Sequence, residues 1–271
     1  MRFHPRDRWT GALSCRSVLR IVNRLSFIFL LVALLPLGAE EPVDRAPVEP
    51  KTLPAPDQAV EPVEASLVKL DDGRMRLGKV EFDPATREIQ FPAQVNMTEG
   101  LLEFLLVHEN GKIHESLLST TISATNLNVV LKLLHYQSSP ELYLKIKEDG
   151  SASSEFQAAT AEQKAGSRLR ILISKESAKR SDAVPVNEWI AHAPTEKPMP
   201  PEPWIYGGSS IHQGRFLAES SGDIFAIFLS NSAVANFGGT DNQNDEVWLP
   251  HATRVPEVGT PVTVIIQPYE S

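Results

Sequence analysis

The segment from Leu105 to Ser119 carries two histidines, two glutamates and two serines around the pair Asn110-Gly111. Imidazole and carboxylate groups are common zinc ligands, and a histidine beside a serine is the start of a nucleophilic dyad. The residue types therefore raise two chemical possibilities, a metal site or a hydrolase centre, and His114, Glu115 and Ser116 are the candidate residues for both.

The elements that hold these side chains decide whether they converge. Asn-Gly is a strong signal for a two-residue type I′ turn, so the segment predicts a β-hairpin with Asn110-Gly111 as its loop. Because strand side chains alternate, this register places His114 with Ser116 on one face and His108 with Glu115 on the other. A zinc site needs three or more converging ligands, and the hairpin offers at most a diagonal pair. We therefore expect an amphipathic hairpin whose histidines point apart.

A second polar cluster is the acidic segment 238–248, which contains Asp241, Asp245 and Glu246. Carboxylate oxygens suit calcium, the metal most often bound by exported proteins through such ligands. The spacing is not that of an EF-hand loop. The expectation is a solvated acidic loop, with the three acids as the candidate metal ligands.

Aromatic residues concentrate in the C-terminal half, where Trp204, Tyr206 and Trp248 are candidates for stacking on a sugar or peptide ligand. Each of them also lies in a strand-like pattern, which is more typical of the hydrophobic core. The sequence favours the core and leaves the ligand role as the alternative.

The N-terminus has the layout of a secretory signal peptide over residues 1–39. Six arginines precede an apolar run from Leu25 to Leu37, and Ala39 offers a small residue for cleavage. The apolar run is shorter than the roughly 18 to 20 residues that span a bilayer. We expect export to the periplasm or the exterior, with an uncleaved membrane anchor as the alternative; contact with a membrane is expected only in that case.

Removing residues 1–39 would take away six of the 26 basic residues and one of the 34 acidic residues, which leaves 20 against 33 and a net charge of −13. A surface of this sign repels phosphate backbones, so nucleic acid is not expected as a partner. The single cysteine, Cys15, lies in the signal peptide. The mature chain thus has no thiol for a disulfide or an iron-sulfur cluster, and the sequence indicates no cofactor.

Residues 40–65 are rich in proline and glutamate and contain no aromatic residue, which predicts a disordered linker. From residue 66 to 271, short apolar runs alternate with turn signals. Among the predicted strands are residues 141–148 and 168–175 and the runs that begin at 204, 214, 223 and 260, with a long loop over 149–167. One helix is predicted at about 124–135, capped by Ser123 or Thr125. The fold class is α+β, an antiparallel, β-rich single domain.

A shift of 111 residues aligns part of the predicted hairpin with the segment 216–230. Five residues match, among them Leu106 with Leu217 and Gly111 with Gly222. Two explanations stay open: a duplicated hairpin, or coincidence between two strand patterns that each contain a turn.

The string from Arg76 to Thr120, with "WIYGGSS", "GRFLAESSGDIFAI" and the closing "VWLPHATRVPEVGTPVTVIIQP", resembles the YdjY-type domain of exported bacterial proteins. The resemblance covers roughly Leu77 to Pro268, and the Gly-Lys-Ile-His-Glu-Ser segment is its most distinctive part. It implies a bacterial, extracytoplasmic, single-domain protein and brings no reaction with it. Some relatives carry a ferredoxin-like label, which the cysteine-free mature chain contradicts.

These features together favour a non-catalytic binding or accessory module of the cell envelope, with an unknown protein or envelope component as its partner. The alternative is a hydrolase or metal-dependent enzyme centred on His114, Glu115 and Ser116.

Overall fold

The computed structural model of the protein describes residues 66–149, 151–175 and 182–270. The predicted signal peptide and linker, residues 1–65, lie outside the described residues. The described chain is β-rich, as expected from its alternating apolar pattern. None of its helices is long and apolar enough to cross a membrane.

The strands on the main sheet are β1 (Leu67–Lys69), β2 (Met75–Leu77), β3 (Val80–Asp83), β4 (Glu88–Val95), β5 (Phe104–His108), β6 (Ser116–Thr120), β9 (Arg168–Lys175), β10 (Val184–Pro185), β13 (Trp204–Tyr206), β16 (Asp223–Ala226), β17 (Ala235–Phe237) and β19 (Pro261–Pro268). Smaller sheets contain β7 (Leu144–Ile146), β8 (Ala152–Phe156), β11 (Ile190–His192), β12 (Lys197–Pro198), β14 (Ile211–His212), β15 (Arg215–Phe216) and β18 (Trp248–Pro250). The helices are α1 (Ala124–Leu133), α2 (Ala161–Gly166), α3 (Leu217–Ser221) and the 3₁₀ turns η1 (Ile113–Glu115) and η3 (Val186–Trp189).

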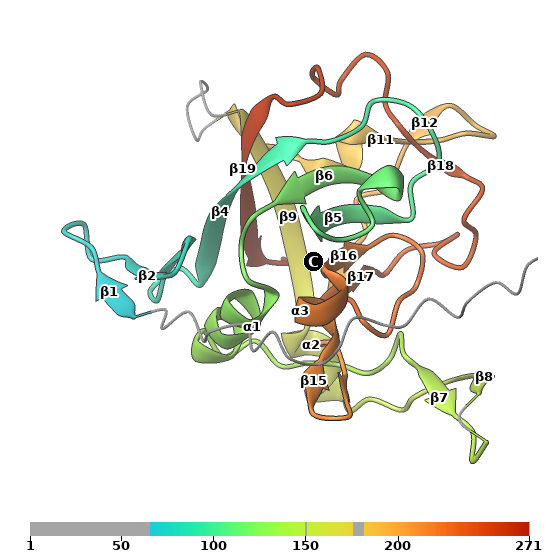
Figure 1. Ribbon diagram of the computed structural model, residues 1–271, viewed down its shortest axis with the longest axis horizontal. Coiled ribbons are helices and arrows are strands. Elements are labelled where there is room, and N and C mark those ends of the chain that lie inside the picture. Colours follow the sequence, from blue (N-terminus) through green and yellow to red (C-terminus); the bar gives the residue numbers. More distant parts are fainter. Residues whose placement is uncertain (1–65, 150, 176–181, 271) are drawn as a thin grey trace, which may run out of the picture. The chain divides into compact units, whose positions relative to one another are not determined.

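Eight strands of the main sheet close into a barrel. They follow the order β4-β19-β9-β13-β17-β16-β5-β6, and β6 pairs back with β4. The long strands β4, β19 and β9 form one wall, and β5, β6, β16 and β17 form another (Figure 1). Closure leaves no free edge among these eight strands, a common solution for antiparallel sheets.

The connectivity of the barrel is repeated in its two halves. In the first half, β5 and β6 run parallel, and β6 pairs antiparallel with β4. In the second half, β16 and β17 run parallel, and β17 pairs antiparallel with β13. The long strands β19 and β9 lie next to β4 and β13 respectively, and the halves meet at the β5–β16 and β9–β19 pairs. The chain therefore builds the barrel from two units of matching topology.

The core fills the barrel through the alternation that the sequence shows. On β9, Leu169, Ile171 and Ile173 belong to the core cluster, whereas Arg170 is exposed and Leu172 and Ser174 are buried outside that cluster. The same alternation on β4 and β19 places their buried aliphatic and aromatic side chains in the one large core cluster. Period-two burial is what a strand with one inner face requires.

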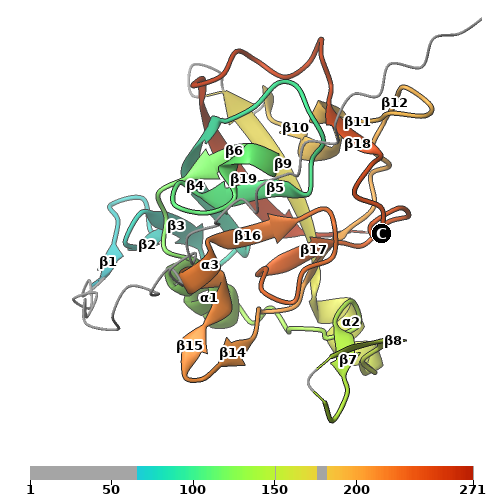
Figure 2. The same ribbon diagram turned by 45° about the vertical axis from the view of Figure 1, so that its right-hand side comes forward.

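The predicted helix at 124–135 is confirmed as α1, which covers one side of the barrel (Figure 2). The hydroxyl of Ser123 accepts a hydrogen bond from the Asn126 N–H at 3.1 Å, so Ser123 is the N-cap. Leu127, Val130 and Leu131 are buried at helical spacing. Local capping and periodicity were sufficient to predict this element.

The predicted hairpin at 105–119 is wrong. β5 and β6 pair in parallel, with Leu106 opposite Leu118, and residues 109–115, which include η1, return the chain to the level at which β5 begins. Neither residue of the Asn110-Gly111 pair has the positive φ that a type I′ turn requires. Four consecutive residues of β5, from Phe104 to Val107, are buried, so this strand is covered on both faces. Such continuous apolar strands are typical of parallel pairing, and the face argument from alternation does not apply to them.

Three other strand or loop predictions are also wrong in part. Residues 217–221 form helix α3 where a strand is predicted, and the long loop at 149–167 contains β8 and α2. The strand predicted at 141–148 shortens to β7. The duplicated hairpin is therefore not formed at the shift of 111, because that shift places most of β5 on helix α3. In the barrel, the pair β5 and β6 corresponds to the pair β16 and β17, which is not the correspondence that a shift of 111 residues gives.

Candidate functional site

The candidate centre at 114–116 does not form a dyad. Ser116 is fully buried, and its hydroxyl donates to the Leu118 carbonyl oxygen at 2.8 Å. His114 points into solvent with 77% of its side chain exposed, and its Nε2 lies 3.6 Å from Glu115 Oε2. The expectation that His114 and Glu115 lie on opposite faces is therefore wrong, because η1 brings adjacent side chains together. The pair contacts, but Ser116 is turned away from it.

His108 is separate from that pair. Its ring atom Nδ1 accepts a hydrogen bond from the Asn110 backbone N–H at 3.2 Å. The backbone N–H of His108 donates to the Gly222 carbonyl oxygen at 2.8 Å. Gly111 packs against Gly222 here: a Cβ on Gly111 would lie 3.3 Å from the Gly222 Cα. Within the part of the chain that the structure describes, no three His, Cys, Asp or Glu side chains are arranged to hold a metal ion.

A polar cluster that the sequence reasoning missed lies beside the segment that connects β5 to β6, which we call the β5–β6 crossover. Asp223, at the start of β16, has 1% of its side chain exposed, and Lys112 Nζ lies 3.7 Å from its Oδ2. The Ser232 hydroxyl donates to the same oxygen. Lys112 also lies over the Phe104 ring, 4.6 Å from its centroid. Asp223 Oδ1 is buried without a hydrogen-bond partner. The buried carboxylate of Asp223 thus contacts both connecting segments of the barrel: the β5–β6 segment through Lys112 and the β16–β17 segment through Ser232.

Glu103 adjoins this cluster. Burial raises the pKa of its carboxyl above the usual value, the negative charge of Glu115 raises it further, and Lys112 opposes the shift. Its backbone ties three segments together, because the N–H donates to the Glu115 carbonyl oxygen and the carbonyl accepts from Ile227 and Phe228. The acid and the lysine are thus positioned by the fold.

The acidic segment does not gather its carboxylates. Asp245 and Glu246 are exposed, and Asp241 Oδ2 lies 3.6 Å from His192 Nε2. The Asp241 carbonyl oxygen accepts from Trp248 Nε1 at 3.2 Å, so the loop is fixed through its backbone. The arrangement is that of a solvated loop that covers the edge of an aromatic core.

The candidate stacking residues are core residues. Trp204 and Tyr206 are 0% exposed and Trp248 is 2% exposed, so none of them offers a ring face to solvent. Trp204 packs at 5.5 Å from Phe237, which in turn meets Trp248 edge-on at 5.9 Å, both measured between ring centroids. The sugar-stacking alternative is therefore wrong for all three rings.

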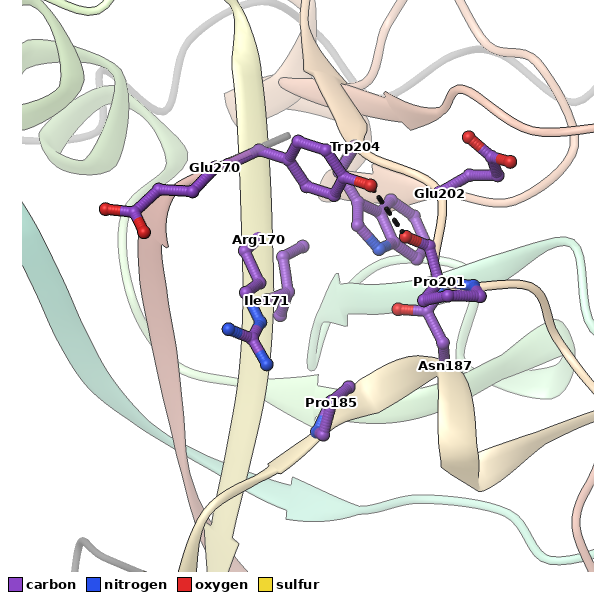
Figure 3. Close-up of a pocket in the computed structure, with 9 residues that line it drawn as sticks. Arg170, Ile171, Pro185, Asn187, Pro201, Glu202, Trp204 and Glu270 are labelled. Atoms are coloured by element: carbon purple, nitrogen blue, oxygen red, sulfur yellow. Dashed lines mark hydrogen bonds between the residues drawn. The ribbon is translucent and has the colours of Figure 1, made fainter.

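One edge of Trp204 has a different role, because it lines a pocket of about 190 Å³ (Figure 3). The pocket lies where strand pairing along β9 is interrupted. β13 pairs with Arg168 and Leu169, β10 pairs with Leu172 and Ile173, and the residues between them, Arg170 and Ile171, line the opening. Pro185, Asn187, Pro201, Glu202, Tyr269 and Glu270 complete the wall. We call this hollow the Trp204 pocket.

One polar group of the Trp204 pocket has no hydrogen-bond partner, although its neighbours do. The indole N–H of Trp204 is buried without a hydrogen-bond partner, and buried donors in native proteins are nearly always paired. Asn187 is buried and fixed, since its Nδ2 donates to the Pro200 carbonyl oxygen at 2.6 Å. The Tyr269 hydroxyl donates to the Pro201 carbonyl oxygen at 3.1 Å and closes one side. The wall of the pocket thus combines two hydrogen-bonded side chains with one unsatisfied donor.

A second pocket adjoins the first. It has a volume of about 240 Å³ and is lined by Thr86, Glu88, Arg170, Gln267, Pro268 and Glu270. Arg170 and Glu270 belong to both pockets, so the two hollows share a wall. Glu88 is buried, and its Oε2 accepts from Gln267 Nε2 at 2.8 Å. We call this hollow the Glu88 pocket.

Sequence reasoning missed these pockets because their residues come from five separate segments of the chain. Two local signals point to them. Arg170 lies between the aliphatic residues Leu169 and Ile171 of β9, and the proline-rich run 198–203 stops directly before Trp204, where a donor-poor backbone meets the core.

Comparison of the chain with protein-family models, with curated proteins and with solved structures found no match.

Proposed function

We propose that this protein is an exported, non-catalytic binding module of the bacterial cell envelope, and that the Trp204 pocket is its ligand-binding site. The observation that carries the proposal is the buried, unpaired indole N–H of Trp204 on the wall of that pocket. A pocket with fixed walls and an unused donor is suited to hold a ligand that supplies the missing acceptor. Export and the YdjY-type family assignment belong to this proposal, on the strength of the signal-like N-terminus and the quoted segments.

The mixture of residues around the pocket supports binding over chemistry. Its described lining contains a guanidinium, two carboxylates, an amide, a phenol and an indole, and no serine, histidine or cysteine. The two carboxylates, which could act as a base or a nucleophile, point away from the hollow in opposite directions (Figure 3) and do not converge on one bound group. The enzyme alternative at 114–116 has no supporting observation, because the Ser116 hydroxyl is committed to a backbone carbonyl inside the barrel.

The proposal is tested by following the indole N–H resonances of ¹⁵N-labelled protein while compound classes are added at millimolar concentration. The panel contains short peptides, N-acetylated amino sugars, monocarboxylates and divalent cations. We expect one class to shift the Trp204 resonance more than those of Trp189 and Trp248. The Arg170→Ala variant should weaken the response, and Arg215→Ala, an exposed arginine on β15 that lines none of the described pockets, should leave it unchanged.

Two results would contradict the proposal. One is a saturable response confined to residues outside the Trp204 pocket, which would place the ligand site elsewhere. The other is the absence of any response of Trp204 to the whole panel while the protein is folded. Turnover of a panel compound that depends on Arg170 would replace the binding role with an enzymatic one.

A further inference from the structure

The orientation of the charges around the Trp204 pocket indicates what kind of ligand it takes. The carboxylates of Glu202 and Glu270 point away from the hollow in opposite directions (Figure 3). The indole nitrogen of Trp204 lies on the side of Ile171 and Asn187. The Trp204 pocket therefore has an unpaired N–H donor buried in its wall, the Arg170 guanidinium among its lining groups, and the acids turned outward.

We propose that the Trp204 pocket receives the C-terminal carboxylate of a peptide, and that the Glu88 pocket receives a cationic side chain of the same peptide. This inference rests on the proposed binding function and names its ligand class. A carboxylate has two acceptor oxygens, and guanidinium and N–H donors form charge-assisted hydrogen bonds with it. Capture of a terminal carboxylate by converging donors is an established mode of peptide recognition.

The unpaired indole N–H is the strongest reason to expect an acceptor in this place. Trp204 is 0% exposed, so its N–H has lost its hydration without gaining a protein partner. Such a donor destabilises the ligand-free protein and favours any ligand that supplies an oxygen. An oxygen that carries negative charge also pairs with Arg170, and an uncharged amide oxygen does so less well.

The size of the pocket favours the end of a chain over a whole ligand. Its volume of about 190 Å³ is below the range of about 300 to 1,000 Å³ usual for sites that enclose a complete small molecule. The Glu88 pocket continues from it across the shared residues Arg170 and Glu270. A ligand anchored in the first hollow can thus extend into the second.

The second hollow has as many acids as the first, but one of them, Glu88, is buried in its wall. Its lining contains the carboxyl groups of Glu88 and Glu270 and a single cation, Arg170, which the carboxylate of the ligand would engage from the first hollow. An acidic lining attracts an ammonium or guanidinium group. The residue before the C-terminal residue, or the one before that, is the part of a peptide that reaches it.

The test compares four acetylated tripeptides that differ in one group each. Acetyl-Gly-Lys-Ala carries both proposed groups, its C-terminal amide lacks the carboxylate, acetyl-Gly-Gln-Ala lacks the cation, and acetyl-Gly-Glu-Ala reverses its charge. Free acetate serves as the small-acid comparison. Affinity is measured by titration calorimetry and by the Trp204 indole resonance on the protein that begins after the predicted signal peptide.

We expect acetyl-Gly-Lys-Ala to bind tightest and its amide to bind at least tenfold more weakly. Arg170→Gln should abolish the preference for the acid over the amide, and Glu270→Gln should reduce the preference for lysine over glutamate severalfold without removing the preference for the acid. Arg215→Gln is the matched control and should change neither preference. None of these exposed positions is part of the core, so the variants are expected to fold.

The outcomes separate this inference from the proposed function. If acid and amide peptides shift Trp204 equally, the pocket still binds, but the carboxylate assignment fails. If the acid is preferred and glutamate binds as well as lysine, the cation subsite fails. If acetate binds as tightly as the tripeptides, the ligand is a small acid and the peptide assignment fails. If no probe shifts Trp204, the peptide proposal fails, and the wider compound panel decides the binding function.

Discussion

At the scale of single residues, the buried carboxylate of Asp223 depends on a lysine that is itself half exposed. Lys112 Nζ lies 3.7 Å from Asp223 Oδ2, with side-chain exposures of 46% and 1%. Removing the amine leaves a buried charge with one hydroxyl donor. We expect Lys112→Met to lower the free energy of unfolding by about 1 to 3 kcal/mol.

The chain offers a matched control for this prediction. Lys145 and Glu155 form a shorter ion pair, 2.6 Å, but both side chains are exposed. Exposed pairs contribute about 1 kcal/mol or less, so Lys145→Met should have a smaller effect in the same denaturant titration. Equal losses for the two variants would show that burial of Asp223 does not set the strength of its pair.

Glu103 gives a prediction about pH. Burial and Glu115 raise the pKa of its carboxyl in the folded protein above the ordinary value of 4.5. The folded state then binds the proton more tightly than the unfolded state, so the ionised form destabilises the fold above the folded pKa. This penalty disappears as the pH falls toward 4.5. Glu103→Gln should therefore be more stable than the parent at pH 7 and lose that advantage in acid, as measured by unfolding at several pH values.

The candidate residues show how far residue types alone can lead. The histidines and acids of 105–119 were conspicuous in composition, but His114 is exposed and Ser116 is buried in the barrel. The polar contacts that matter there involve Lys112 and Asp223, which are 111 positions apart in the chain. No local pattern encodes that contact, because it arises from pairing between β5 and β16.

At the scale of elements, Gly111 in the β5–β6 crossover packs directly against Gly222 at the C-terminus of helix α3. A Cβ on Gly222 would lie 2.9 Å from the Gly111 Cα, and Gly222 has a φ of +78°. We expect Gly222→Ala to destabilise the protein by more than the roughly 1 to 2 kcal/mol that a left-handed conformation alone costs a residue with a side chain.

Gly214 separates the two contributions. Its φ is +75°, and nothing lies within 4 Å of the position of its Cβ. Gly214→Ala should therefore show the conformational cost without the steric cost. If thermal unfolding gives the two variants the same loss of stability, close packing between the glycines is not a constraint on the fold.

Elements with local signals were predictable and elements defined by pairing were not. Helix α1 and strand β9 match their predicted spans because a cap and an alternating pattern specify them. The direction of β6 relative to β5 depends on the burial of both faces of β5, which Asn110-Gly111 does not reveal. An Asn-Gly pair indicates a turn only where the backbone is free to take positive φ at both residues.

At the scale of the whole molecule, the closed barrel predicts a single cooperative unit. The chain from Ser66 to Ser271 should unfold in one transition with the same free energy as the longer chain that begins at Glu40. Beginning the chain at Val80 removes Met75 and Leu77, which pack on the core, and should lower that free energy. Denaturant titration of the three proteins measures both effects, and separate transitions within residues 66–271 would contradict the single unit.

The two halves of the barrel share their topology, but the strand pairing at the corresponding place differs in length; we call these two pairings, β4–β19 and β9–β13, the seams. β19 and β4 are joined over six residue pairs, whereas their counterparts β9 and β13 are joined over two. The Trp204 pocket lies beside the shorter of these two strand pairings, β9–β13. Because the Trp204 pocket lies at the shorter of the two seams, the proposed peptide should saturate at one molecule per chain.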